Sequence, residues 1–296
     1  MSSASDTHTL LRDFDLHRPA LFALAYRMLG SVMDAEDIVQ EAFLRWQQVP
    51  MDQVASPKAY LLTITTRLCL DHLRSARARR ETYIGPWLPE PLVLSDSDPD
   101  AALDRADTLS FAFLLLLERL TPLERAVFIL HDVFGYTYDE VGQMIGSNAP
   151  YCRQLGHRAR ERVSTGRPRF EATAAQAEQA VHQFVRACTE GDMQGLLNLF
   201  ANDITLWSDG GGKAHAARNP IIGADRVARF MLGVQRKVTV PVAIQPARVN
   251  GQIGLILWLT GQLYSVYVFD VDHQSRIRAI YVMLNPAKLR GVSFAP

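Results

Sequence analysis

Arginine is the residue whose spacing in this sequence most clearly suggests a chemistry. Residues 66–80 set several arginines against a single acidic residue, Asp71, and these arginines are Arg67, Arg74, Arg77, Arg79 and Arg80. A guanidinium group donates in a planar fork to phosphate oxygens and base edges. The neighbouring Thr63, Thr65, Thr66 and His72 could contact an opened nucleic-acid strand. The stretch predicts a helix that binds nucleic acid, with a merely solvated charged face as the alternative.

A second arginine-rich stretch, residues 149–163, follows two helix-start signals. Thr121-Pro-Leu-Glu124 and Thr137-Tyr-Asp-Glu140 are capping boxes, and Gly146-Ser147-Asn148 is a turn signal. Helix, glycine turn and helix in this order are typical of a helix-turn-helix, whereas an ordinary three-helix bundle is the alternative. Cys152, Leu155 and Ala159 are expected to face the core. The residues expected to face DNA are Asn148, Tyr151, Arg153, Gln154, His157, Arg158 and Arg160.

An acidic helix is expected over residues 34–46. Asp34 is predicted to cap it, and the periodicity points Ile38, Ala42 and Trp46 inward. A polar face remains, made of Asp37, Gln40, Glu41 and Arg45. Taken alone, this face indicates either a protein-binding patch or a solvated surface.

Length and composition set the frame for these elements. With 296 residues, of which 48% are hydrophobic, the chain can bury more than one core and is not a disordered segment. Lys and Arg (31) balance Asp and Glu (31), so only local charge can indicate nucleic-acid binding. Cys69, Cys152 and Cys188 have no metal or disulfide spacing, and no leader or membrane segment is evident. We therefore expect a soluble cytoplasmic protein without a bound metal.

Breaks in the pattern divide the chain into four segments. Residues 11–82 are expected to form one helical domain, 83–107 an acidic, proline-rich linker, and 108–165 a second helical domain. Residues 172–296 begin with an amphipathic helix near 175–189. From about Val238 they become rich in strand formers, with turns at Asn250-Gly251 and near Asp272, which predicts a curved antiparallel sheet.

Taken in order, the segments between about residues 11 and 165 resemble domains 2 and 4 of extracytoplasmic-function (ECF) sigma factors. The resemblance implies that residues 34–46 bind core RNA polymerase, on the beta-prime subunit, with the beta subunit as a further partner. It also implies that residues 58–80 melt and read the minus-ten promoter element, and that residues 137–160 read the minus-thirty-five element. The expected activity is transcription initiation without catalysis by this chain and without a cofactor.

Three further strings resemble signatures of sigma factors with a SnoaL-like extension, the sigma J type. They are Trp87-Leu-Pro-Glu-Pro91, Asp209-Gly-Gly-Gly-Lys213 and Asn285-Pro-Ala-Lys-Leu289, the last with Ala287 where the pattern has Asp. The resemblance implies two all-α domains and a C-terminal α+β cone that regulates them. The residues expected at the regulatory contact are Trp87, Pro89, Asp209, Gly210, Gly211, Gly212, Lys213, Asn285 and Pro286.

The cone resemblance leaves two further expectations open. Related cones enclose pockets, so an unknown small-molecule ligand is one expectation. The alternative function is an isomerase or cyclase fused to a DNA-binding regulator, with Asp209 or His215 as the base. We expect Asp209 to be a mobile, solvated carboxylate in a glycine-rich docking turn, which would suit proton abstraction poorly. The three strings are expected to lie close together.

Overall fold

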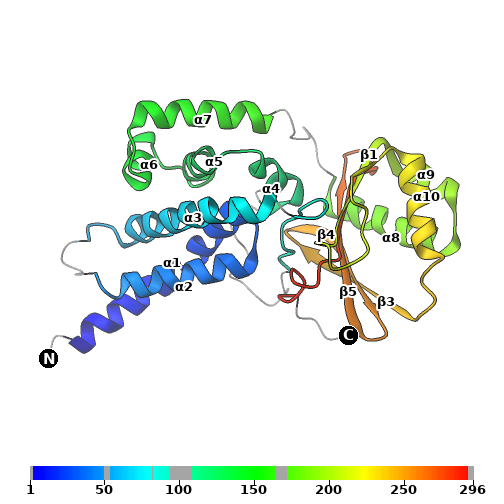
Figure 1. The fold of residues 1–296 in the computed structure, drawn as a ribbon, viewed down its shortest axis with the longest axis horizontal. Helices are drawn as coiled ribbons and strands as arrows, with labels where there is room; N and C mark the ends of the chain where they lie inside the picture. Colours follow the sequence, from blue (N-terminus) through cyan, green and yellow to red (C-terminus); the bar gives the residue numbers. More distant parts are fainter. Residues whose placement is uncertain (1–2, 50–53, 82, 94–108, 165–171, 293–296) are drawn as a thin grey trace. The chain divides into compact units, whose positions relative to one another are not determined.

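The computed structural model describes residues 3–49, 54–81, 83–93, 109–164 and 172–292, which form two compact units (Figure 1). The helical unit contains α1 to α3 and α5 to α7, and the sheet unit contains the described linker residues and everything from α8 onward. Helix α4 begins in the sheet unit and continues in the helical unit. None of the helices in these ranges has the length and apolarity needed to cross a bilayer.

The helical unit is built from helices of very different length whose buried apolar side chains meet. Trp46 is fully buried, and its indole Nε1 donates to the carbonyl of Leu10 at 3.0 Å. The elements are α1 (Ser3–Leu29), α2 (Val32–Trp46), α3 (Pro57–Glu81), α4 (Phe111–Glu118), α5 (Pro122–Phe128), the π-helix η4 (Ile129–Val133), α6 (Tyr138–Ile145) and α7 (Ala149–Ser164).

Local signals fix most of these helix ends. Thr121 and Thr137 form both halves of their capping boxes, and Gly146 ends α6 with a positive φ of 71°. The start of α2 differs from the expectation: Ser31, not Asp34, is the N-cap, and its hydroxyl accepts from the backbone N–H of Asp34. Gly30 ends α1 with φ 66°, so Ser31 is the first residue free to cap the next helix.

Buried arginine contacts tie the helices of this unit together. The guanidinium of Arg125 in α5 donates to the carbonyl of Met28 in α1 and to Glu118, each at 2.6 Å. Arg67 in α3 donates through Nε to the carbonyl of Met144 in α6 at 3.0 Å. Helices that precede the linker and helices that follow it are thus joined by charge-assisted hydrogen bonds.

The sheet unit is a six-stranded sheet covered on one face by three helices. Its strand order is β2-β1-β6-β5-β4-β3, and β1 lies parallel to β6 while all other pairs are antiparallel. The expected sheet was wholly antiparallel and began near Val238, so β1 and its parallel pairing correct that expectation. The elements are α8 (Ala174–Glu190), α9 (Met193–Leu199), β1 (Phe200–Asp209), β2 (Ile221–Ile222), α10 (Ala224–Gln235), β3 (Val242–Val249), β4 (Gln252–Leu259), β5 (Gln262–Val271) and β6 (Ile277–Met283).

Aromatic packing forms the centre of this unit. Phe184 of α8 packs edge-on to Phe269 of β5, with ring centroids 5.1 Å apart, and lies 6.3 Å from Phe200 at the start of β1. All three side chains are at most 3% exposed. The helix expected near residues 175–189 is confirmed as α8, and its Phe184 packs against the sheet.

Gly142 in α6 tests how tightly the turn between α6 and α7 is packed. A Cβ there would lie 2.9 Å from the carbonyl oxygen of Ser147, whereas a Cβ on Gly233 of α10 would meet nothing within 4 Å. Gly142→Ala should therefore lower the free energy of unfolding by about 1–3 kcal/mol, whereas Gly233→Ala should raise it by about 0.5–1 kcal/mol. Urea denaturation followed by circular dichroism measures both. Equal stabilisation by the two substitutions would show that the turn has room to spare.

Candidate functional site

The polar face of α2 lies on the surface, as expected. Asp37 and Gln40 are exposed, Glu41 is half-buried, and Glu41 pairs with Arg45 at 3.1 Å. Ile38, Ala42 and Trp46 are buried on the opposite face. Two exposed apolar side chains, Met33 (47%) and Leu44 (53%), also belong to α2. The helix therefore presents a mixed acidic and apolar surface.

The arginine-rich helix α3 divides its polar residues between structure and surface. Thr63 donates to the carbonyl of Ala59, and Thr66 donates to the carbonyl of Leu62, both at 2.7 Å. Thr66 is completely buried, so the expectation that it contacts DNA is not met. Its hydroxyl is satisfied by a carbonyl of the preceding helical turn instead.

Arg67, His72 and Arg74 of α3 each lie next to an acidic or carbonyl group. Arg67 binds the end of α6, His72 lies 3.5 Å from Asp34, and the exposed Arg74 pairs with Asp71 at 3.1 Å. The side chains of Arg77, Arg79 and Arg80 lie outside the described residues. Arg74 keeps 68% of its side chain exposed despite its pair with Asp71.

Helix α7 presents a row of exposed donors. Asn148 accepts from the backbone N–H of Tyr151 at 2.9 Å and so starts the helix, and Cys152, Leu155 and Ala159 are buried as expected. The exposed side chains include Tyr151, Arg153, Gln154, His157 and Arg158. Tyr151, Arg153 and Gln154 lie in the N-terminal half of α7, the part of the second helix that contacts base edges in helix-turn-helix proteins, whereas His157 and Arg158 lie in its C-terminal half.

Arg160 and Arg162, in contrast, hold α7 in place. Arg160 binds Asp132 of the π-helix at 2.7 Å and the hydroxyl of Tyr138 at 2.7 Å, while Arg162 pairs with the buried Glu124. Arg160 was expected to contact DNA, but its guanidinium is already used inside the unit. The π-helix that carries Asp132 gives no signal in the sequence, because its residues continue a helical periodicity without a break.

The three unusual strings meet in the sheet unit, as expected, around Asp209. This carboxylate is completely buried and accepts from the hydroxyl of Tyr83 at 2.5 Å, the backbone N–H of Leu88 at 2.9 Å and the ammonium of Lys288 at 2.8 Å. Asn285 donates to the same Tyr83 hydroxyl at 2.9 Å. We call these five residues the linker clamp. Asp209 is therefore not the mobile, solvated carboxylate that was expected.

The ammonium of Lys288 supplies the positive charge that offsets the burial of the Asp209 carboxylate. This ammonium also donates to the carbonyl of Leu88 at 2.5 Å and lies 4.1 Å from the ring centroid of Trp87. Burial and the hydrogen bond to the Asp209 carboxylate raise the pKa of Tyr83 well above its ordinary value, so the phenol stays protonated and donates. Each hydrogen-bonding group that surrounds the carboxylate is thus a donor.

The glycine turn after Asp209 fits closely against the linker and the tail. Gly211 has a φ of 56°, and a Cβ there would collide with the Asn285 side-chain amide and lie 2.9 Å from the Tyr83 hydroxyl. A Cβ on Gly212 would lie 3.0 Å from Ile84. Glycine is required here because another segment passes within side-chain distance.

The remaining residues of the three strings are divided by exposure. Pro89 and Gly210 are buried, whereas Lys213 and Pro286 are exposed. Ala287 keeps the local turn without the expected Asp, because its backbone N–H donates to the Asn285 side chain at 3.1 Å. His215, the other candidate base, is exposed, and no cluster of metal-ligating side chains exists among the described residues.

A second set of contacts, which the sequence did not reveal, holds Leu92 within the linker and Leu109 just after it. Asn250 is buried in the β3–β4 turn, donates its backbone N–H to the Leu92 carbonyl at 2.8 Å and accepts from the Leu92 N–H at 2.9 Å. Its side-chain amide donates to the carbonyl of Leu109 at 3.0 Å, and Gln252 accepts from the Phe111 N–H at 2.9 Å. We call this set the hairpin anchor. The sequence marked this place only as a turn at Asn250-Gly251. In the structure Asn250 has a positive φ of 53°.

Comparison with known proteins assigns these elements. Residues 14–79 match Sigma-70 region 2 and residues 110–163 match Sigma-70 region 4, so the exposed helices α2, α3 and α7 lie in the two sigma regions of a transcription initiation factor. The chain is 41% identical over 247 residues to the ECF RNA polymerase sigma factor SigJ of Mycobacterium tuberculosis, covering 82% of this chain and 79% of that protein. This chain therefore belongs to the ECF sigma factor family.

Two further likenesses extend over nearly the whole chain. The probable ECF RNA polymerase sigma factor SigI of M. tuberculosis is 34% identical over 276 residues, covering 92% of each chain. The crystal structure of M. tuberculosis SigJ superimposes with a TM-score of 0.76 at 34% identity, covering 95% of this chain and 98% of that one. The expected fold, two helical sigma domains followed by an α+β domain, is thus confirmed.

Lys288 and Lys213 form a matched pair for testing the linker clamp. Lys288→Met leaves Asp209 buried without its cation and should lower the free energy of unfolding by about 3–5 kcal/mol. Lys213→Met removes the same charge from an exposed position and should change it by less than about 0.5 kcal/mol. Urea denaturation of the full chain measures both, and equal stabilities would mean that Asp209 does not depend on its ammonium partner.

Proposed function

We propose that this sigma factor docks on core RNA polymerase through the polar face of α2, on the beta-prime subunit and with further contacts to the beta subunit. In this proposal α3 reads the minus-ten element and α7 the minus-thirty-five element, and the C-terminal domain modulates both by controlling the linker. We place the working boundaries at residues 11–82, 83–107, 108–165 and 172–296. The relatives that cover the chain are sigma factors, which supports a transcription factor without catalysis.

The hairpin anchor is the observation that carries the modulatory role. Asn250 binds Leu92, near the end of the described linker stretch, and Leu109, just after the linker. Val93 also forms an isolated antiparallel bridge with Val249. One turn of the C-terminal domain therefore holds the segment that leaves sigma region 2 and the segment that enters region 4. Spacing between promoter-reading helices depends on this connection, so the domain is placed to control it.

The linker clamp adds a second, separable hold. It uses the tail residues Asn285 and Lys288, whereas the hairpin anchor uses the β3–β4 turn. The clamp can therefore be loosened by changing the tail while the hairpin anchor stays intact. This arrangement supports a domain that both restrains the sigma regions and keeps them in a polymerase-competent arrangement.

The enzyme alternative is weakened by the surroundings of Asp209. Its two carboxylate oxygens accept from Tyr83, Leu88 and Lys288, and the side chain has no exposed surface. A general base needs a lone pair within reach of a substrate proton. Here the donors that surround the carboxylate belong to the chain itself, so Asp209 serves the architecture of the domain.

Docking through α2 can be tested by removing its polar side chains. The triple substitution Asp37→Ala, Gln40→Ala and Glu41→Ala should weaken binding to core polymerase at least about tenfold if these groups make charged contacts, because Asp37 and Gln40 are exposed and Glu41 is half-buried. Asp225→Ala in the C-terminal domain is the control, since it removes an equally exposed carboxylate. Pull-down on core polymerase at equal concentrations measures the change. Unchanged binding by the triple variant would move the docking surface away from α2.

Shortening the chain tests the modulatory role. A chain that ends at Leu284 keeps β6 and the hairpin anchor but loses Asn285 and Lys288, and it should give more transcript than the full chain. A chain that ends at Ser164 loses both holds and should give little transcript, because a proline-rich linker alone fixes domain spacing poorly. The measurement is transcription from one cognate promoter with core polymerase at matched sigma concentrations. Equal transcript from all three chains would exclude modulation.

A further inference from the structure

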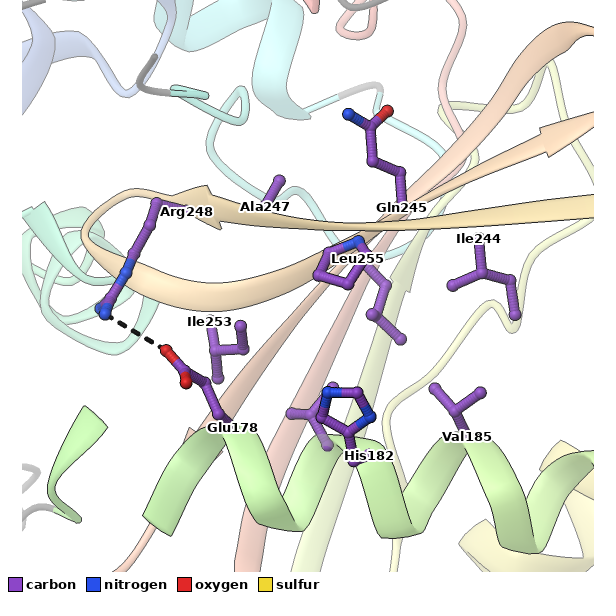
Figure 2. A pocket seen from close by; sticks show the side chains of 11 residues that line it. Glu178, His182, Val185, Ile244, Gln245, Ala247, Arg248, Ile253 and Leu255 are labelled. Carbon is purple, nitrogen blue, oxygen red and sulfur yellow. Dashed lines mark hydrogen bonds and ion pairs between the residues drawn. The ribbon is translucent and has the colours of Figure 1, made fainter. Parts of the chain in front are cut away.

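The C-terminal domain contains an open groove that its contacts to the linker do not use. Helix α8 and strand β3 line a cavity of about 680 Å³, a size that suits a small organic molecule. Figure 2 shows Glu178, His182 and Val185 of α8 facing Ile244 and Arg248 of β3 across this space, with Ile253 and Leu255 between them. We call it the α8–β3 groove.

Both walls of the groove change from charged to apolar in the same direction. At one end Arg248 pairs with Glu178 at 3.5 Å, and beyond His182 the walls become Val185 and Ile244. The groove continues into a smaller apolar cavity that shares those two residues and Leu255. Residues of this second cavity include Cys188, Val242, Leu257 and Tyr267. Because side chains alternate along a strand, Val242, Ile244 and Arg248 share one face of β3.

Apolar side chains are left exposed where this face of β3 borders solvent. Ile244 is 42% exposed and Val242 37%, although β3 is an edge strand, where natural sheets favour charge. The polar groups at the deep end are neutral: burial raises the pKa of Cys188 to about 12 and also raises that of Tyr267. The surface is therefore suited to an uncharged chain and not to a second charged group.

We propose that the α8–β3 groove binds an elongated amphipathic carboxylate, such as a fatty acid, with its head group on Arg248 and its chain along Ile244 toward Tyr267. The face of β3 from Val242 to Arg248 extends roughly 20 Å at about 3.3 Å per residue, which is the reach of a medium or long acyl chain. A guanidinium binds a carboxylate through two parallel hydrogen bonds.

The carboxylate of Glu178 would repel an anionic head group, but its ion pair with Arg248 is weak. Their atoms lie 3.5 Å apart, with 44% of the Arg248 side chain and 50% of the Glu178 side chain exposed. Exposed pairs of this kind contribute little. A ligand carboxylate can therefore replace Glu178 on the guanidinium while Glu178 turns to solvent.

The head-group end of the groove adjoins the hairpin anchor. Arg248 is followed directly by Val249, which bridges to Val93, and by Asn250 of the hairpin anchor. Binding in the groove would thus act next to the connection between the sigma regions, a consequence that rests on the proposed function. The binding itself does not, and it is measurable without polymerase or DNA.

Calorimetric titration of the full chain with sodium dodecanoate, below its micelle concentration, tests the proposal. We expect saturable binding of one dodecanoate per chain. Ile244→Glu should abolish it by placing a carboxylate against the acyl chain, and Arg248→Gln should weaken it about tenfold through loss of a charge-assisted hydrogen bond. Dodecyltrimethylammonium has the same chain but a cationic head that cannot accept a hydrogen bond from Arg248. It should therefore bind at least about tenfold more weakly than dodecanoate.

Matched substitutions elsewhere in the same domain separate the groove from general surface effects. Ile222→Glu alters an apolar side chain that is 58% exposed, and Arg229→Gln alters an exposed arginine that is also paired with a carboxylate. Both should bind dodecanoate like the unaltered chain, and urea denaturation confirms that all four variants fold. The proposal is overturned if dodecanoate gives no saturable heat, if Ile222→Glu weakens binding as much as Ile244→Glu, or if the cationic amphiphile binds as tightly.

Discussion

Asp209 ends strand β1 and has no solvent-exposed surface. A buried carboxylate is stable only if hydrogen-bond donors or a cation surround it. The partners of Asp209 come from the linker, through Tyr83 and Leu88, and from the tail, through Lys288. Three segments far apart in sequence are therefore joined by one charge. Gly211 follows from the same constraint, because a side chain there would occupy the space that Asn285 and Tyr83 fill.

Arginine has a comparable role inside the helical unit. Arg125 carries a buried guanidinium from α5 to the carbonyl of Met28 in α1, and Arg160 fixes α7 to the π-helix through Asp132. In each case the planar fork satisfies groups from two helices at once. Part of the arginine content of the described residues therefore serves the interior of the unit, whereas Arg153 and Arg158 are exposed on α7.

Local signals in the sequence predicted local structure well. The capping boxes at Thr121 and Thr137, the glycine end at Gly146 and the turn at Asn250 all depend on residues within a few positions of each other. Features that depend on distant residues were not predictable in the same way. The parallel pairing of β1 with β6, for example, joins strands whose sequences say nothing about their neighbour.

Site residues follow the same division. Exposure of Asp37 and Gln40 on α2 follows from helical periodicity. Burial of Asp209 did not follow from its glycine-rich context, since glycine permits both a mobile turn and a close contact. No motif next to Tyr83 marks it as a partner of Asp209. The ion pair between Arg160 and Asp132 depends on how two helices pack, because the two residues are far apart in the sequence.

The hairpin anchor also bears on how such chains can diverge. Leu92 and Leu109 bind the same side chain, so the stretch between them leaves and returns to one place whatever its length. Closing a longer loop costs little, about 0.6 kcal/mol for each doubling of its length. Insertions and deletions between these two leucines can therefore accumulate without changing the contacts that Asn250 makes to them.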